Sequence, residues 1–155
     1  MIKSTWFLGG TACPDGDEIR KKVFVNEQKY PISVEFDDHD KTCDHLLLTV
    51  DGTPAATARV FMTDEQTAKI GRLAVLKEYR GQHLGAELIK ELKKRSKALG
   101  AKKIYVSAQV YAVPFYEKYG FRAYGNEYLD IHIPHMDMDL SLIHISEPTR
   151  QAEIS

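Results

Sequence analysis

The middle of the chain reads GRLAVLKEYRGQHLG, from Gly71 to Gly85. An apolar run predicts a strand over residues 68–76, and a run with helical spacing begins at Leu84. In a turn that joins a strand to a helix, amide N–H groups point outward beside the positive end of the helix dipole, which suits a pyrophosphate ligand. The stretch matches neither the Walker A motif nor the Gly-x-Gly-x-x-Gly fingerprint. On spacing alone, a tight connection without a ligand explains the turn equally well.

The composition is that of an ordinary globular chain. It has 155 residues, of which 43% are hydrophobic, enough for one domain whose core needs no disulfide or metal. The net charge of −1 does not favour nucleic acid or an anionic membrane as a partner. Cys13 and Cys43 form no CxxC pair, and no metal-ligand spacing is present. The spacing of the histidines and cysteines therefore predicts no metal site. Because no apolar stretch is long enough for a signal peptide or a membrane span, we expect a cytoplasmic protein.

The remaining elements follow from hydrophobic period and turn residues. The expected helices are residues 17–28, 84–99 and 114–119. The expected strands are residues 45–50, 53–62, 68–76, 104–108, 121–124 and 131–139. Asp51-Gly52 separates the first two of these strands, and an Asp-Gly between two apolar runs predicts a hairpin.

Two charged segments are predicted to be solvated. Acidic residues crowd residues 35–44 around His39. They could attract a cationic amine, but such a density of charge is more typical of a solvated loop. A basic cluster at residues 93–97 lies at the end of the long helix, where cations complement the helix dipole, and Gly100 provides the stop.

Two short blocks resemble the GCN5-related N-acetyltransferase family. Residues 80–85, RGQHLG, are similar to the family's acetyl-CoA motif, Arg/Gln-x-x-Gly-x-Gly/Ala, except that His83 stands where glycine is preferred. If that position has a positive φ, histidine is among the better tolerated side chains. Residues 113–121, VPFYEKYGF, are similar to the family's Phe-Tyr-Glu-Lys-x-Gly-Phe signature. The resemblance spans residues 18–139 and looks closest to the small ElaA-like branch.

The resemblance implies an α/β fold with a mixed, mainly antiparallel sheet flanked by helices. It implies acetyl-CoA as the co-substrate, bound where two neighbouring strands diverge. The main chain of Leu73, Ala74 and Val75 would pair with pantetheine, and the Val75 N–H would face the thioester carbonyl as part of an oxyanion site. Arg80 would lie near the phosphates. The amides that would hold the pyrophosphate are those of Gly81, Gln82, His83, Leu84, Gly85 and Ala86.

The resemblance also assigns catalytic candidates. Tyr116 would lie beside the CoA sulfur and could protonate the departing thiolate, since a phenol has a reference pKa of about 10. An ordinary core tyrosine is the alternative. A substrate ammonium must lose its proton to a base or an ordered water before it attacks. Our candidate bases are Glu27, which could face either way at its helix end, and His135, which could equally be a satisfied core histidine. Further candidates are Glu35, Asp37 and His39.

Residues 140–155 resemble the translation of a sequencing-library adapter. We expect them to be a non-native tail that follows a domain of residues 1–139, and a genuine terminus is the alternative.

The reaction expected is direct acetyl transfer to a primary amine of a small-molecule acceptor, by a monomer or a homodimer. Neither cysteine lies in a motif that argues for a covalent acyl-enzyme. The alternatives are an inactive CoA-binding regulatory module and acyl transfer to a homoserine-lactone-type acceptor. Variable loops build acceptor pockets on one fold, so the two motifs predict the reaction and not a particular acceptor.

Overall fold

The β2–β3 hairpin confirms the strongest local prediction. The computed structural model describes residues 1–143, in which β2 (Asp44–Val50) pairs antiparallel with β3 (Thr53–Met62). The backbone φ is +49° at Asp51 and +86° at Gly52. A type I′ hairpin turn requires positive φ at both central residues, so the Asp-Gly pair accounts for the turn.

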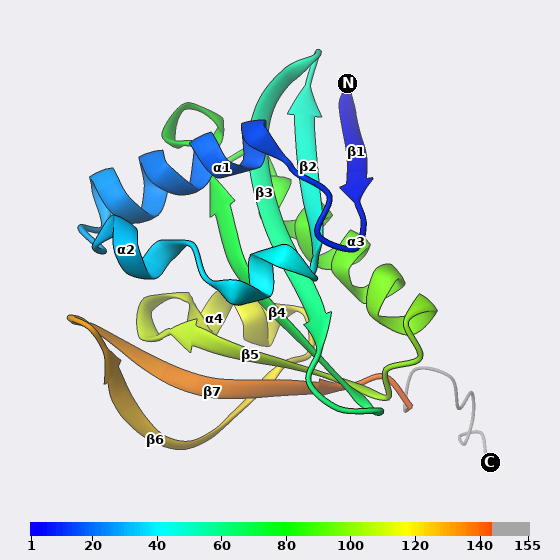
Figure 1. Cartoon of the computed structure of the whole chain (residues 1–155). Helices are drawn as coiled ribbons and strands as arrows, with labels where there is room; N and C mark the ends of the chain where they lie inside the picture. Colours follow the sequence, from blue (N-terminus) through cyan, green and yellow to red (C-terminus); the bar gives the residue numbers. More distant parts are fainter. Residues whose placement is uncertain (144–155) are drawn as a thin grey trace. The chain divides into compact units, whose positions relative to one another are not determined.

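Within the described residues, seven strands form a sheet with the order β1-β2-β3-β4-β5-β7-β6 (Figure 1). The other strands are β1 (Ile2–Phe7), β4 (Thr67–Val75), β5 (Lys103–Gln109), β6 (Arg122–Asp130) and β7 (Ile133–Ser141). The helices are α1 (Pro14–Arg20), α2 (Ile32–Glu35), α3 (Leu84–Ala98) and α4 (Val113–Lys118). Shorter helical segments are the π-helix η1 (Lys21–Glu27) and the 3₁₀ helices η2 (Asp38–Lys41), η3 (Lys77–Tyr79) and η4 (Val110–Ala112). The predicted mixed, mainly antiparallel sheet flanked by helices is confirmed.

The chain folds as two compact units. The first contains Met1–Phe61 and Ile70–Lys94, and the second contains Met62–Lys69 and the chain from Arg95 onward. Strand β4 begins in the second unit and continues in the first. Most of the predicted tail falls on residues 144–155, which lie outside the described residues. None of the described helices is long and apolar enough to cross a membrane.

In the first unit, helices cover both faces of the sheet. Figure 1 shows α1 in front of β2 and β3 and α3 behind them. The consecutive residues Leu46, Leu47 and Leu48 are all buried. Since successive side chains of a strand point to opposite faces, this run requires cover on both sides. Buried Ile19 and Leu88 confirm the core-facing sides predicted for α1 and α3.

Two elements near the N-terminus differ from the prediction. The first helix begins at Pro14, whose fixed φ suits a first helical turn, and it widens into a π-helix from Lys21. Strand β1 was not predicted, because IKSTWF shows no clear alternation of apolar and polar residues. Antiparallel pairing with β2, from Ile2 opposite Val50 to Phe7 opposite His45, forms this strand.

The acidic segment is not a solvated loop, and that prediction was wrong. It begins at the last residue of α2 and contains η2, and Glu35 is only 4% exposed. The Asp37 side chain accepts a backbone N–H of η2, and the Asp40 side chain accepts the backbone N–H of Asp37, so the two side chains cap η2 reciprocally. Buried arginines neutralise the acids, as described below, and this pairing lets the segment pack.

The second unit is built on β5, β7 and β6. Antiparallel pairing joins β5 to β7 and β7 to β6, and Ile104, Val106 and Met138 are buried on one side. Strand β7 runs two residues beyond its expected end, to Ser141. The next residue, Leu142, is 4% exposed and its N–H donates to the Lys102 carbonyl at 2.8 Å. The chain is therefore packed through Leu142.

Candidate active site

The turn that follows β4 contains two left-handed residues. The backbone φ is +81° at Gly81 and +65° at His83. A Cβ added to Gly81 would meet no atom within 4 Å, so the backbone there borders open space. The side chains of Gln82 and His83 are exposed. His83 therefore adopts a conformation that glycine takes freely and that histidine tolerates better than most residues.

The first amides of α3 follow directly. The N–H of Glu87 donates to the His83 carbonyl at 3.3 Å. The preceding amides, those of Leu84, Gly85 and Ala86, have no acceptor one turn earlier within the helix. Since α3 has 15 residues, its N-terminus also carries a full helix dipole, and such an end binds phosphate oxygens.

Arg80 is oriented by two other predicted site residues. Its Nε donates to the Val75 carbonyl at 3.0 Å, and its Nη2 donates to Glu27 Oε1 at 2.8 Å. The side chains of Arg80 and Glu27 are 45% and 36% exposed, so the ion pair adds little stability. Its effect is geometric: the guanidinium is held beside the strand end and the turn.

The three residues predicted to pair with pantetheine end strand β4. Ala74 is buried, and Leu73 and Val75 are partly buried. They follow Arg72, whose φ of +54° interrupts the extended backbone within the strand. A left-handed arginine in a strand is uncommon, and strained backbone of this kind clusters at functional sites.

Three arginines and three carboxylates form a charged group in the first unit, which we call the arginine–carboxylate cluster. Its members are Arg20, Arg59, Arg72, Glu35, Asp37 and Asp40. Arg20 donates to Glu35 Oε2 at 2.9 Å and to Asp40 Oδ1 at 2.8 Å. Arg59 donates to Asp37 Oδ1 at 2.7 Å and to Asp40 Oδ1 at 2.9 Å. The formal charges of the six groups balance, as burial requires.

The pKa values in this cluster follow from burial and from the guanidinium groups. Burial opposes ionisation of Asp40, but hydrogen bonds from Arg20 and from the Asp37 N–H outweigh it and hold the pKa of Asp40 well below its usual range. Burial likewise opposes ionisation of Asp37, and Arg59 outweighs it to lower the pKa of Asp37. For Glu35, burial dominates and raises the pKa of the carboxyl.

Two further base candidates, Glu35 and Asp37, are thus engaged by arginines rather than presented to a substrate. The third, His39, is exposed, and its ring stacks on Phe61 with centroids 4.1 Å apart. A signal for the cluster was present in the sequence. Arg59 interrupts the apolar strand 53–62, and a buried arginine needs carboxylate partners such as those of the acidic segment.

In the second unit, Tyr116 lies in α4. It is 7% exposed, and its ring makes edge-on contacts with Phe115 at 5.2 Å and Phe121 at 5.5 Å between centroids. Burial, with a smaller contribution from Tyr111, raises the pKa of Tyr116 above its usual range. The hydroxyl therefore keeps its proton at neutral pH, as a proton donor must.

His135 lies in β7 of the same unit and is 5% exposed. Its Nδ1 is 2.8 Å from the Ile133 carbonyl, which only accepts hydrogen bonds, so Nδ1 is the donor in this contact. The Nε2 atom is 3.8 Å from Asp130 Oδ2, and the ring stacks near Tyr128, with centroids 6.1 Å apart.

A hydrogen-bonded group beside His135 was not predicted. The hydroxyls of Tyr105 and Tyr128 donate to Asp137 Oδ1 at 2.5 Å and 2.7 Å, and Ser107 bonds to Tyr128. Burial and the bond to Asp137 raise the pKa of Tyr105. These residues share a face only because β5 and β6 pair with opposite edges of β7, a register that no local motif specifies.

Asp40, Cys43 and His45 also approach one another, with possible ligand atoms within 4.8 Å. Their chemistry does not suit a metal ion. The Asp40 carboxylate is already bound by Arg20 and Arg59, two positive groups that would repel a cation. Burial raises the pKa of the Cys43 thiol to about 11.

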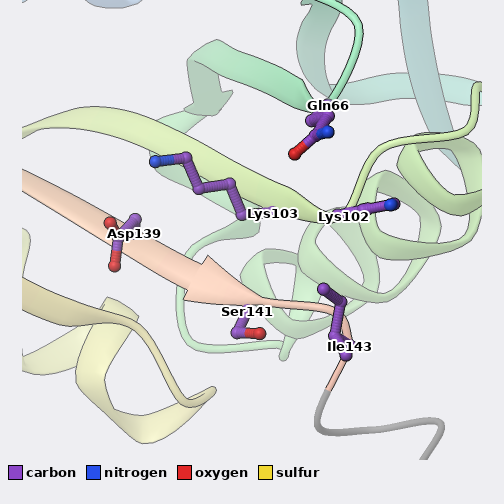
Figure 2. A pocket seen from close by; sticks show the side chains of 6 residues that line it. All are labelled: Gln66, Lys102, Lys103, Asp139, Ser141 and Ile143. Carbon is purple, nitrogen blue, oxygen red and sulfur yellow. The ribbon is translucent and has the colours of Figure 1, made fainter.

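A pocket of about 290 Å³ lies elsewhere in the second unit, around the ends of β5 and β7. Figure 2 shows the side chains that line it: Gln66, Lys102, Lys103, Asp139, Ser141 and Ile143. None of these was predicted as a site residue, so the pocket is separate from the motifs.

The predicted site residues are divided between the two units. Glu27, the end of β4 and the turn at 80–86 lie in the first unit, where Arg80 joins the first two. Tyr116 and His135 lie in the second. The first unit thus contains the predicted cofactor residues, and the second contains the predicted general acid.

Comparison with known proteins identifies the family. The profile of the acetyltransferase (GNAT) domain matches residues 13–142. A candidate acetyltransferase of Bacillus subtilis is 40% identical over 124 residues, which cover 78% of this chain and 84% of that protein. ElaA of Escherichia coli is 31% identical over 131 residues, which cover 81% of this chain and 85% of ElaA. The chain belongs to the GNAT acetyltransferase family, which confirms the resemblance.

Solved structures share the fold. The crystal structure of Escherichia coli ElaA superposes with a TM-score of 0.80 at 27% identity and covers 91% of this chain and 100% of that chain. A GNAT family acetyltransferase from Elizabethkingia anophelis, solved with acetyl-CoA bound, superposes with a TM-score of 0.67 at 18% identity, over 91% of this chain and 98% of that chain. At that lower identity the likeness concerns the fold alone.

Proposed function

We propose that the protein binds acetyl-CoA and transfers its acetyl group directly to a primary amine of a small molecule. The observation that carries this proposal is the turn with left-handed Gly81 and His83 at the start of α3, in a chain of the GNAT family. Acetyl-CoA bound to the Elizabethkingia anophelis protein of the same fold supports the choice of co-substrate.

The backbone of the turn would bind the pyrophosphate. Open space at Gly81 allows close approach, and the amides of residues 84–86 are available at the helix N-terminus. Arg80, oriented by Glu27, would add a positive charge near the phosphates. The main chain of Leu73, Ala74 and Val75 would pair with pantetheine.

The chemistry is nucleophilic acyl substitution. The acceptor ammonium gives up a proton, and its nitrogen then attacks the thioester carbon to form a C–N bond. The Val75 N–H would stabilise the negative oxygen of the tetrahedral intermediate. As the C–S bond breaks, the nitrogen would lose its second proton to solvent, and Tyr116 would donate its proton to the sulfur and recover one from solvent. The products are an N-acetyl amine, CoA and one proton.

His135 is the better of the two candidate bases. The Glu27 carboxylate is bound by the Arg80 guanidinium, whereas the Ile133 carbonyl binds Nδ1 of His135, so that in the neutral ring Nε2 would be the basic nitrogen. A fixed tautomer with a basic nitrogen is what general-base catalysis requires.

The test starts with a screen of primary amines for CoA release by the purified protein. For an active amine, we expect Tyr116→Phe to slow single-turnover acetyl transfer by about 10²-fold or more, since a positioned acid typically contributes that much. The affinity for acetyl-CoA should stay within about threefold of wild type, because the ring and its packing remain.

Tyr124→Phe is the matched control, because it removes the same hydroxyl from a residue that is 46% exposed and that does not contribute to the pKa shift of Tyr116. It should transfer acetyl at the wild-type rate. Equal rates for Tyr116→Phe and wild type would remove Tyr116 from the mechanism. Binding of acetyl-CoA without release of CoA for any amine would favour the regulatory module instead.

A further inference from the structure

The strained residue of β4 is an arginine, although a glycine stands beside it. Arg72 has a φ of +54°, whereas Gly71 is not among the left-handed glycines. A Cβ added to Gly71 would meet no atom within 4 Å, so space alone does not require glycine there. The left-handed conformation at residue 72 is strained for an arginine, and such strain persists only where surrounding contacts compensate for it.

That compensation comes from the end of α2. The Nε and Nη2 atoms of Arg72 donate to the Glu35 carbonyl at 3.2 Å and 2.9 Å. Nε also lies 3.1 Å from Glu35 Oε2, and Nη2 lies 3.4 Å from Asp37 Oδ2. Because the last carbonyls of a helix lack intrahelical donors, Arg72 acts as the C-terminal cap of α2.

The anchor for Arg72 is rigid. Arg20 donates to Glu35 Oε2 at 2.9 Å and to the Glu35 carbonyl at 2.8 Å, and both residues are less than 5% exposed. Arg59, on β3, holds Asp37 through two hydrogen bonds of 2.7 Å and 2.9 Å. Arg72 is the member of the cluster whose own backbone belongs to β4, one residue before the predicted pantetheine-binding segment.

We propose that Arg72 is a positioning residue for acetyl-CoA: by clamping the end of α2, it holds the left-handed backbone from which Leu73, Ala74 and Val75 emerge. This inference rests on the proposed function of those three residues. Coupling between two segments is reciprocal, so acetyl-CoA bound to β4 also stabilises the α2–η2 segment, residues 32–41.

Two substitutions separate the side chain from the backbone conformation. In Arg72→Gly, residue 72 can adopt a positive φ without steric cost, but the hydrogen bonds of the guanidinium to the end of α2 are lost. In Arg72→Ala the same hydrogen bonds are lost and the steric cost of the positive φ remains. We expect calorimetric Kd values for acetyl-CoA to rise by about 10-fold in Arg72→Gly and further in Arg72→Ala. Glu35 keeps its bond to Arg20 in both variants, which supports folding.

Lys41→Ala is the control, because Lys41 lies in η2 but its side chain is 79% exposed and pairs with exposed Asp38. Its Kd should stay within about twofold of wild type, as for other exposed ion pairs. Hydrogen exchange provides a second measurement. Acetyl-CoA should slow amide exchange in residues 32–41 of wild type and Lys41→Ala, but not of Arg72→Gly. A residue that only stabilises the fold would lower the melting temperature without removing this response.

The inference is overturned if Arg72→Gly binds acetyl-CoA within about twofold of wild type and keeps the protection of residues 32–41. If Arg72→Gly does not melt cooperatively, Arg72→Lys decides, because a lysine cannot make the paired bonds to the Glu35 carbonyl. A wild-type Kd for Arg72→Lys would then refute the clamp. Wild-type protein that does not bind acetyl-CoA would overturn the proposed function itself, and the inference with it.

Discussion

The turn at residues 80–86 and the arginine–carboxylate cluster belong to the same unit. The turn offers mainly backbone groups, whereas the cluster is built from side chains. In the turn, Gln82 and His83 are exposed, and the left-handed backbone with the helix amides would bind the pyrophosphate in our proposal. In the cluster, Arg20 is 2% exposed and Glu35 4%, and the side chains make the contacts. The comparison implies that side-chain identity matters little at Gln82 and His83 and greatly in the cluster.

The largest effect is expected from Arg20→Met. It removes hydrogen bonds to Glu35 and Asp40, and breaking a buried ion pair on one side typically costs about 3–5 kcal/mol. Urea unfolding at pH 7 measures the loss. Lys21→Met is the control, since Lys21 forms an exposed pair with Glu18 and should cost less than about 0.5 kcal/mol. Similar losses for both variants would contradict the central role of the cluster.

The end of β7 is a second place where we expect a buried side chain to determine the stability of the protein. Truncation after Leu140 removes Leu142, which is 4% exposed and bonded to Lys102, and should destabilise the protein by about 2–4 kcal/mol. Truncation after Ile143 removes the remainder of the proposed non-native tail, and we expect no change in the melting temperature or in acetyl-CoA binding. A drop of several degrees in the melting temperature after truncation at Ile143 would refute the proposal that the tail is non-native.

Acid should weaken the cluster and leave the backbone of the turn unaffected. Because the pKa values of Asp37 and Asp40 are lowered on folding, their contribution to stability is complete above the ordinary value of about 3.9 and is lost as pH falls below it. Glu35, with a raised pKa, acts in the opposite direction as pH falls.

Asp40→Asn tests this pH dependence directly. Asparagine resembles protonated aspartic acid, so the stability gap between wild type and Asp40→Asn should narrow as the pH falls from 6 to 3. Urea midpoints at several pH values measure the gap. A constant gap would mean that the ionised form of Asp40 contributes nothing.

The smallest effect is expected from His83→Gly, and it tests the other half of the comparison. Glycine relieves the left-handed strain at residue 83 but gains more entropy in the unfolded chain, so stability should change by less than about 1 kcal/mol. The acetyl-CoA affinity, measured by calorimetry, should be kept or improved. His83→Val, which is poorly suited to positive φ, should bind more weakly. A strong loss in His83→Gly would show that the imidazole contacts the ligand.

The positions of most elements could be predicted because their signals are local. Asp51-Gly52 is sufficient for its turn, and the spacing of Leu84, Leu88 and Leu92 is sufficient for a helical face. Strand β1 escaped prediction because its stability comes from pairing with β2. The solvated loop was a wrong prediction because its acids meet arginines that are remote in sequence.

The candidate site divides in the same way. The motif from Arg80 to Gly85 is contiguous, and a backbone that binds phosphate depends on residues next to one another, so the sequence by itself determined the family and was sufficient to predict a cofactor cradle. Only the tertiary structure decided that Glu27 orients Arg80 and that α2 holds Arg72. Ion pairs across 37 or 53 residues depend on how strands and helices pack, and no local period or spacing specifies that packing.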